Sequence, residues 1–163
     1  MDKLKVYIEN RQKAVKIPSG MRLLVRRSCN ATLVNEKFEG SAEVNVTFVD
    51  DAQIKELNSH YRHKDTATDV LSFPMGTDGK YDLNPDTGAY VLGDVVISLE
   101  RAAEQAEEHD VTLQEEVSFL TVHSMLHLLG YDHENGGLEA IRMHDKENVI
   151  LAALGFERDI YEE

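Results

Sequence analysis

The sequence predicts an α+β domain in which a small mixed β-sheet is packed with helices in layers, with a metal-bearing helix in the C-terminal half. Strand-like and helix-like stretches follow one another in the first half of the chain, whereas helical patterns dominate the second half. The 163 residues are 42% hydrophobic and 29% charged, which is ordinary for one globular domain with a substantial core. No repeat, low-complexity tract or linker divides the chain, so we expect residues 1–163 to form a single domain.

The expected strands alternate apolar with polar residues, or are largely apolar between turn signals. They cover residues 4–10, 42–49, 68–73 and 90–97. Pro74 should stop the third strand, because proline cannot donate to a strand ladder. Residues 75–89 concentrate Gly, Asp and Asn, which is typical of a long loop or a hairpin tip. Gly93 and Asp94 interrupt the fourth strand, where Asp94 is either a functional carboxylate or a strand-end cap.

The expected helices begin after side chains that can accept a hydrogen bond from the first helical turn. They cover approximately residues 21–35, 51–58, 99–109, 113–129 and 138–154. The expected N-caps are Ser19, Asp50, Ser98 and Thr112, with Gln53 and Glu115 at capping-box positions. In the last helix the expected packing face is Ile141, Val149, Leu151 and Leu154.

Charge is unevenly distributed along the chain. The net charge of −13 by itself argues against a nucleic-acid partner. Residues 1–37, however, hold nine basic and three acidic side chains, a balance of +6, and the remainder holds eight basic and twenty-seven acidic ones, a balance of −19. This asymmetry indicates either a basic face on an acidic body or a solvated helix face.

Cysteine usage and hydropathy indicate the compartment. Cys29 is the only cysteine, so no intrachain disulfide can form and a reducing cytosol fits. The N-terminus lacks the apolar segment of a signal peptide, and no run approaches the length of a transmembrane helix. We therefore expect a soluble cytoplasmic protein.

Three of the seven histidines lie within eleven residues, from His123 to His133. On a helix His123 and His127 project from one face, with Cβ atoms roughly 5–6 Å apart. Gly130 can adopt the left-handed conformation that ends a helix, and the chain can then bring His133 back toward the other two. Three neutral imidazoles suit a transition metal and leave a position for water. Structural zinc sites usually contain cysteine, and Cys29 is far away in sequence, which favours a catalytic site.

The spacing of these histidines resembles that of the metzincin zinc proteases, which carry a glutamate after the first histidine as general base. In this chain that position is Ser124, whose hydroxyl is a poor base near neutral pH. The alternative without a metal is that the histidines are packed core residues. The third histidine, after a correctly placed glycine, argues against that alternative.

Three histidines outside the motif are interpreted as surface residues: His63, His109 and His144.

Arg62, His63 and Lys64 form a cationic cluster ahead of the third expected strand. Such a cluster is usually a solvated turn. In a chain this acidic it also suits an anionic ligand, because arginine binds phosphate through two parallel hydrogen bonds.

Together these motifs resemble the YbeY family of bacterial metal-dependent endoribonucleases. The resemblance rests on His123-x3-His127-Leu-x-Gly130-Tyr131-Asp132-His133, on the segment from Tyr61 to Pro74, and on Leu92-Gly93-Asp94, in this order and at similar spacing. Ser124 departs from the glycine that the family usually has there. The resemblance implies zinc binding by His123, His127 and His133, catalytic roles for Arg62 and His123, and substrate binding by Arg62, Lys64 and Asp94.

The resemblance also implies a substrate and partners. It predicts a single-strand-specific endoribonuclease that matures the 3′ end of 16S rRNA and acts in late ribosome quality control, in contact with the ribosome or small-subunit proteins. One Zn²⁺ ion is the expected cofactor, although three histidines would bind nickel or another divalent transition metal comparably well. The alternatives are a ribosome-assembly or RNA-binding factor with a structural zinc and a metzincin-like peptidase.

Overall fold

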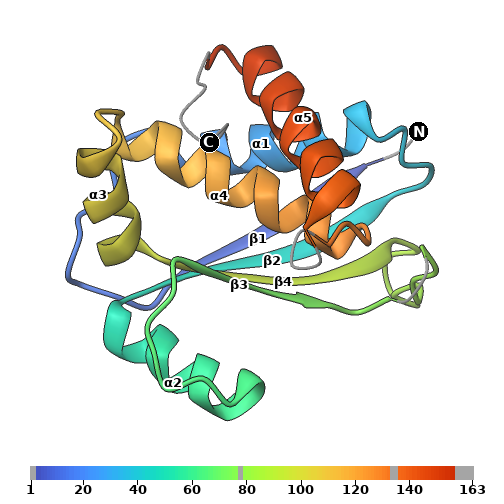
Figure 1. Ribbon diagram of the computed structural model, residues 1–163. Coiled ribbons are helices and arrows are strands. Elements are labelled where there is room, and N and C mark those ends of the chain that lie inside the picture. Colours follow the sequence, from blue (N-terminus) through green and yellow to red (C-terminus); the bar gives the residue numbers. More distant parts are fainter. Residues whose placement is uncertain (1–2, 77–78, 133–135, 157–163) are drawn as a thin grey trace.

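The computed structural model describes residues 3–76, 79–132 and 136–156, and Figure 1 shows how they are arranged. The described strands are β1 (Leu4–Asn10), β2 (Ala42–Val49), β3 (Val70–Pro74) and β4 (Tyr90–Ser98). The described helices are α1 (Met21–Asn35), α2 (Asp51–Arg62), α3 (Leu99–Glu108), α4 (Leu113–Leu128) and α5 (Gly137–Ala153). The predicted α+β class, with a mixed sheet and a helical C-terminal half, is confirmed.

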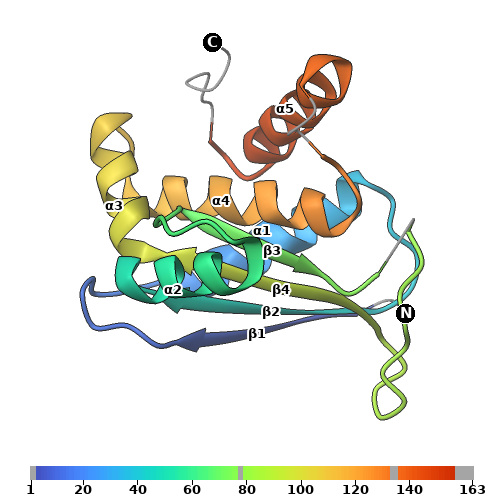
Figure 2. The same cartoon turned by 60° about the horizontal axis from the view of Figure 1, so that its bottom comes forward.

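The strands form one sheet in the order β1-β2-β4-β3. Strands β1, β2 and β4 run parallel, and β3 pairs antiparallel with β4. The segment 75–89 therefore connects the two strands of a hairpin, which was one of the two predictions for it. Strand β3 begins at Val70 rather than at Thr68 and includes Pro74. Because β1 and β3 are the outermost strands, they form the two edges of the sheet, as Figure 2 shows.

Helices α1, α4 and α5 lie on one side of the sheet, and α2 lies on the other (Figure 1). The main core fills the space between the sheet and α1 and α4, and a smaller cluster of Val49, Ile54, Leu71 and Val96 lies under α2. Helix α4 is buried on nearly all sides over residues 116–126, because it is enclosed by the sheet and by α1, α3 and α5. None of the described helices is long and apolar enough to cross a membrane.

Strand β4 runs without a break through Gly93 and Asp94, where the sequence predicted an interruption. Its register with β2 shifts at Leu92, which is the extra residue of a β-bulge. Gly93 has a φ of 143°, and a Cβ at this position would lie 2.3 Å from the carbonyl oxygen of Phe73. Glycine is therefore required here by the close approach of β3.

Helix α2 continues to Arg62, beyond the predicted end near Asn58. Asn58 is buried, and its side-chain amide donates to the carbonyl of Thr66 at 2.9 Å, so it braces the following loop instead of ending the helix. His63 ends the helix by adopting the left-handed conformation, with a φ of 57°. The extra turn brings Arg62 to the edge of the sheet.

The helix starts follow the predicted caps with one exception. Asp50 forms a complete capping box with Gln53, and Ser98 and Thr112 each accept a hydrogen bond from the first turn of their helix. Ser19 does not cap α1, because Gly20 occupies the N-cap position and no side chain caps that helix.

Helix α5 turns a partly different face inward than predicted: Leu151 is buried and Leu154 packs against the core as expected, but the other two positions differ. Ile141 and Val149 are exposed, and the buried residues are Met143, Glu147, Ile150 and Leu151. A carboxylate therefore lies within the apolar stripe that packs against α4 and α1.

Candidate functional site

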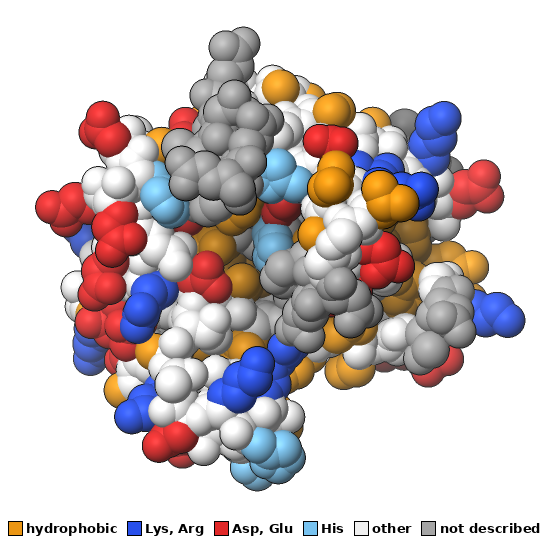
Figure 3. Space-filling model, viewed as in Figure 1, with side chains coloured by type: hydrophobic (Ala, Val, Ile, Leu, Met, Phe, Trp, Pro, Cys, Tyr) orange, Lys and Arg blue, Asp and Glu red, His pale blue; other side chains and the backbone are white. Residues whose placement is uncertain are grey.

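A cleft of about 730 Å³ opens between the edge strand β3 and helix α4. Its lining comes from the end of α2, from the segment before β3, from α4 and from the turn that follows α4, and it includes Arg62, Lys64, Asp69, His123 and His127. In Figure 3 histidine side chains lie around a hollow in the middle of this face, and Lys and Arg side chains lie below it over α2. Arg62, Lys64 and the two histidines were all predicted as site residues, and they share this one cleft.

The end of helix α4 sets the position of the histidines. Gly130 has a φ of 105° and donates its N–H to the carbonyl of His127 at 3.0 Å. The N–H of Tyr131 reaches back to the carbonyl of Leu126, also at 3.0 Å. These two bonds form a Schellman motif, so Gly130 ends the helix as predicted. The motif folds Tyr131 back over the last turn, where its own carbonyl faces His127.

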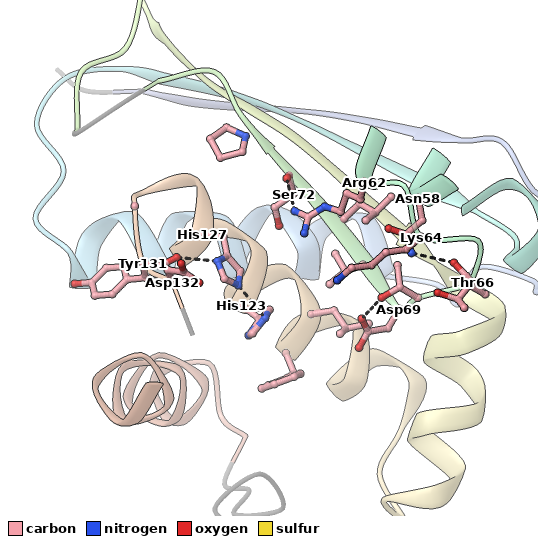
Figure 4. A pocket seen from close by; sticks show the side chains of 18 residues that line it. Asn58, Arg62, Lys64, Thr66, Asp69, Ser72, His123, His127, Tyr131 and Asp132 are labelled. Carbon is pink, nitrogen blue, oxygen red and sulfur yellow. Dashed lines mark hydrogen bonds between the residues drawn. The ribbon is translucent and has the colours of Figure 1, made fainter. Parts of the chain in front are cut away.

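His123 and His127 face each other across one helical turn, as Figure 4 shows. Their Nε2 atoms lie 3.2 Å apart. The Nδ1 atom of His123 lies 2.6 Å from Oε2 of Glu147, and that of His127 lies 2.7 Å from the carbonyl oxygen of Tyr131. Since each Nδ1 faces an acceptor, each carries the proton, and each Nε2 presents a lone pair to the other.

This arrangement fits a tetrahedral metal ion. Two metal–nitrogen bonds of about 2.0–2.1 Å at a tetrahedral angle hold their nitrogen atoms roughly 3.3 Å apart, close to the 3.2 Å between these two Nε2 atoms. His133, the predicted third ligand, lies outside the described residues. Within the described ranges, no three or more His, Cys, Asp and Glu side chains gather into a possible metal site. The described chain thus supplies two ligands already oriented for a metal.

Glu147 orients His123 from helix α5. Its side chain is only 5% exposed, and its second oxygen, Oε1, lies 3.8 Å from Nδ1 of His144. A carboxylate on the far nitrogen of a histidine fixes the ring and its tautomer. Sequence reasoning missed Glu147 and placed His144 on the surface, although its side chain is 21% exposed. The available signal was a glutamate at helical spacing between Met143 and Leu151.

His127 is held through Tyr131. The hydroxyl of Tyr131 donates to Oε1 of Glu36 at the end of α1, and the ammonium of Lys146 on α5 donates to Oε2 of Glu36 at 2.9 Å. Partial burial raises the pKa of the Glu36 carboxyl, but the hydrogen bonds from Tyr131 and Lys146 outweigh it and leave this pKa below its ordinary value. The turn that presents His127 is therefore tied to both α1 and α5.

Arg62 and Lys64 reach the cleft from the other side of the sheet. Helix α2 lies on the opposite face; its last turn carries Arg62, and the segment that follows the helix carries Lys64, to the edge of β3 (Figure 4). Nη2 of Arg62 lies 3.5 Å from the carbonyl oxygen of Ser72 in β3. Two cations therefore line the same cleft as the histidine pair.

Ser124 does not face the cleft as a base. It is fully buried, and its hydroxyl shares a hydrogen bond with the hydroxyl of Ser72 in β3. This contact joins α4 to β3 beneath the site.

Asp94 does not line the cleft. It lies within β4 rather than at its end, so the strand-end cap is ruled out, and its Oδ1 accepts a hydrogen bond from Asn45 at 2.9 Å. It lines a separate depression together with Leu57 and Tyr61 of α2. The sheet separates this carboxylate from the histidine pair.

A second buried carboxylate, Glu116 of α4, was also missed. It is fully buried, and one of its oxygens lies 3.4 Å from Nδ1 of His109. With its amide nitrogen turned toward the carboxylates, Gln105 donates to Glu116 at 3.2 Å and to Asp69 at 3.3 Å. His109 is thus half-buried rather than a surface residue, and the network supports the cleft wall at Asp69.

The fold and cleft define a small α+β protein in which a pair of oriented histidines shares one cleft with an arginine and a lysine. The family model described as Endoribonuclease YbeY matches residues 7–155. The chain is 46% identical over 160 residues to Endoribonuclease YbeY of Caldanaerobacter subterraneus, covering 95% of this chain and 100% of the relative. It is 41% identical over 155 residues to that of Alkaliphilus oremlandii, with the same coverage of 95% and 100%.

The solution structure of TM1509 from Thermotoga maritima is similar to this chain in fold. It has a TM-score of 0.59 and 27% sequence identity, over 90% of this chain and 86% of that one. The chain belongs to the YbeY endoribonuclease family, as its motifs indicated, and this membership supports a role in cutting RNA.

Proposed function

We propose that this protein is a metal-dependent endoribonuclease specific for single-stranded RNA. It acts in the cytoplasm, on the 3′ end of 16S rRNA and in late ribosome quality control, in contact with the ribosome or small-subunit proteins. The observation that carries the metal dependence is the pair of Nε2 lone pairs 3.2 Å apart, each fixed by an acceptor on its Nδ1. The RNA substrate follows from the family.

His123, His127 and His133 would hold one divalent ion, with zinc as the first choice and nickel or another transition metal as alternatives. When bound there, the ion supplies Lewis acidity and lowers the pKa of water toward about 7. Glu147 and the Tyr131 carbonyl keep the two described histidines in the tautomer that this role needs.

Arg62 binds the phosphate that is to be cleaved. Its guanidinium lies in the cleft against β3 and can donate two hydrogen bonds to phosphoryl oxygens, whose negative charge grows in the transition state. Lys64 adds a second positive charge to the same cleft and positions a neighbouring phosphate. Asp94, on the other face of the sheet, is not assigned to this cleft.

Neither alternative is favoured by a specific contact. A metzincin-like peptidase needs a carboxylate base directly after His123, and the chain has there a buried serine bonded to Ser72. A structural zinc predicts that chelation unfolds the protein, whereas a catalytic metal leaves most of the fold intact. Thermal melts with and without a chelator separate these two roles.

The direct test is cleavage of a labelled single-stranded 16S rRNA 3′ fragment, with the same fragment annealed to its complement as the duplex control. We expect His127→Ala to abolish cleavage and Arg62→Ala to lower kcat by about 10²–10³. The matched controls are His60→Ala and Lys55→Ala, which change exposed side chains of α2 outside the cleft lining. Equal cleavage by all variants, or cleavage of the duplex at the same rate, would contradict the proposal.

A further inference from the structure

The basic N-terminal part of the chain lies outside the cleft. From residue 3 to residue 31 the chain has eight Lys and Arg but one acidic residue, Glu9, which pairs with Arg11 at 2.9 Å. We call the other seven cations the basic belt: Lys3, Lys5, Lys13, Lys16, Arg22, Arg26 and Arg27. All seven are exposed, and within the described ranges none forms an ion pair with a carboxylate.

The belt follows the β1 edge of the sheet. Nη1 of Arg22 lies 3.4 Å from the carbonyl oxygen of Ile8, near the end of β1. Farther along α1, Arg26 and Arg27 line a groove of about 450 Å³ together with residues of β1 and the end of α5. Because Arg22 and Arg26 are four residues apart, they project from the same side of the helix. Arginines therefore run along α1 beside the edge strand.

This edge is opposite the cleft. In the strand order β1-β2-β4-β3, the cleft lies at β3 and the belt at β1. Three strand spacings separate the two edges, roughly 14 Å. The molecule thus presents two separate sets of cations, one at each edge of the sheet.

Folding alone does not explain the belt. Lysines on an edge strand deter pairing with other chains, which accounts for Lys3 and Lys5 but not for the arginines of α1. The chain has twenty-nine acidic residues besides Glu9, yet among the described residues none forms an ion pair with the belt, and the charge of Lys5 acts only at longer range on Glu43. Unpaired like charges held together complement an external polyanion, and the planar guanidinium suits phosphate oxygens.

We propose that the basic belt binds the phosphate backbone of a folded RNA whose unpaired segment enters the cleft. This inference rests on the proposed function for the identity of the polyanion. The belt contacts backbone and carries no base specificity, so it strengthens binding of structured RNA without choosing the cleaved bond. Its contribution is predicted to weaken steeply with salt, because each neutralised phosphate releases counterions.

The test compares two labelled RNAs by fluorescence anisotropy: a hairpin with a single-stranded 3′ tail, and the tail alone. His127→Ala is used as the background, and gels verify that the RNA stays whole. The belt variant is Arg22→Gln/Arg26→Gln/Arg27→Gln. The control with the same change in net charge is Lys55→Gln/Lys80→Gln/Arg142→Gln, which alters exposed cations elsewhere. Thermal melts verify that both variants fold.

We expect the belt variant to bind the hairpin about tenfold or more weakly at low salt, with a slope of log K against log salt smaller by roughly 2 to 3. The tail alone should bind equally well, and the control should bind both RNAs like the parent. Unchanged hairpin binding by the belt variant, or an equal loss of hairpin affinity in the control variant, would overturn the proposal. The belt would then bind an acidic protein or no partner at all. If the wild type cleaves no RNA while hairpin binding depends on the belt, the proposed function fails and this inference stands.

Discussion

Replacing Glu147 with alanine removes the acceptor that fixes His123 without touching a metal ligand. The Oε2 atom of Glu147 lies 2.6 Å from Nδ1 of His123, and the glutamate side chain is 5% exposed. Once the carboxylate is gone, the imidazole can rotate and can move its proton to Nε2, the atom that faces His127. The Nε2 lone pairs of His123 and His127 are then no longer held in the orientation that binds a metal.

The size of the effect follows from the contact. Loss of such a partner typically costs about 10–100-fold in metal affinity, or about 1.4–2.7 kcal/mol. The bond is short and charge-assisted, and burial leaves little room for a replacing water, so we expect the upper part of this range, about 30–100-fold. Glu147→Gln keeps an acceptor oxygen without the charge, and we expect a loss of about 3–10-fold.

The assay is zinc competition against a chromophoric chelator, together with ¹⁵N NMR of the histidine rings without metal. The wild type should show His123 protonated at Nδ1, and Glu147→Ala should show a mixture of tautomers. Asp145→Asn is the matched control, because this carboxylate is exposed on the same helix. Wild-type zinc affinity and an unchanged tautomer in a folded Glu147→Ala protein would refute the assigned role of Glu147.

Three further outcomes test the supports of the site. Because the folded-state pKa of Glu36 is lowered, its contribution to stability is present above the ordinary value of 4.5 and is lost as pH falls through the folded value. In urea melts Glu36→Gln should therefore be less stable than wild type by about 1–2 kcal/mol at pH 7, and the difference should shrink below pH 4.5; a difference that persists at low pH would contradict the ionic role. Ser72→Ala should lower the free energy of unfolding by about 1 kcal/mol, because it leaves the buried hydroxyl of Ser124 without this hydrogen bond. The double variant Ser72→Ala/Ser124→Ala should lose less stability than the sum of the two single variants. Additive losses in the double-mutant cycle would show that the two hydroxyls do not interact. Burial raises the pKa of the Cys29 thiol to about 12, so this cysteine should resist alkylation at pH 8 until the protein unfolds, and rapid labelling of the native protein would contradict its burial.

Local features were predictable from the sequence because their causes are local. The alternation in residues 42–49, the capping box of Asp50 and the glycine after α4 each act within a few residues, and each is confirmed. The spacing of His123 and His127 sufficed to place both rings on one side of a helix.

Contacts between distant segments were not predictable in this way. The predicted end of α2 was wrong because the side-chain amide of Asn58 donates to the carbonyl of Thr66, eight residues away. Nothing in the sequence of the helix itself indicates that bond. Glu147 was missed because its partner, His123, lies on another helix and is 24 residues distant. Asp94 was grouped with the site residues by motif, yet the direction of a side chain in a strand depends on register, which the bulge at Leu92 alters.

The position of the cleft at an open edge of the sheet also bears on aggregation. An unpaired edge strand offers its backbone N–H and carbonyl groups to any other extended chain. Strand β3 has only five residues and ends in Pro74, which has no N–H to offer, so the ladder that a second copy could form there is short. The β1 edge is flanked by Lys3 and Lys5, whose charges repel an identical edge. The cleft can therefore lie beside an open strand edge that offers a second copy only a short ladder.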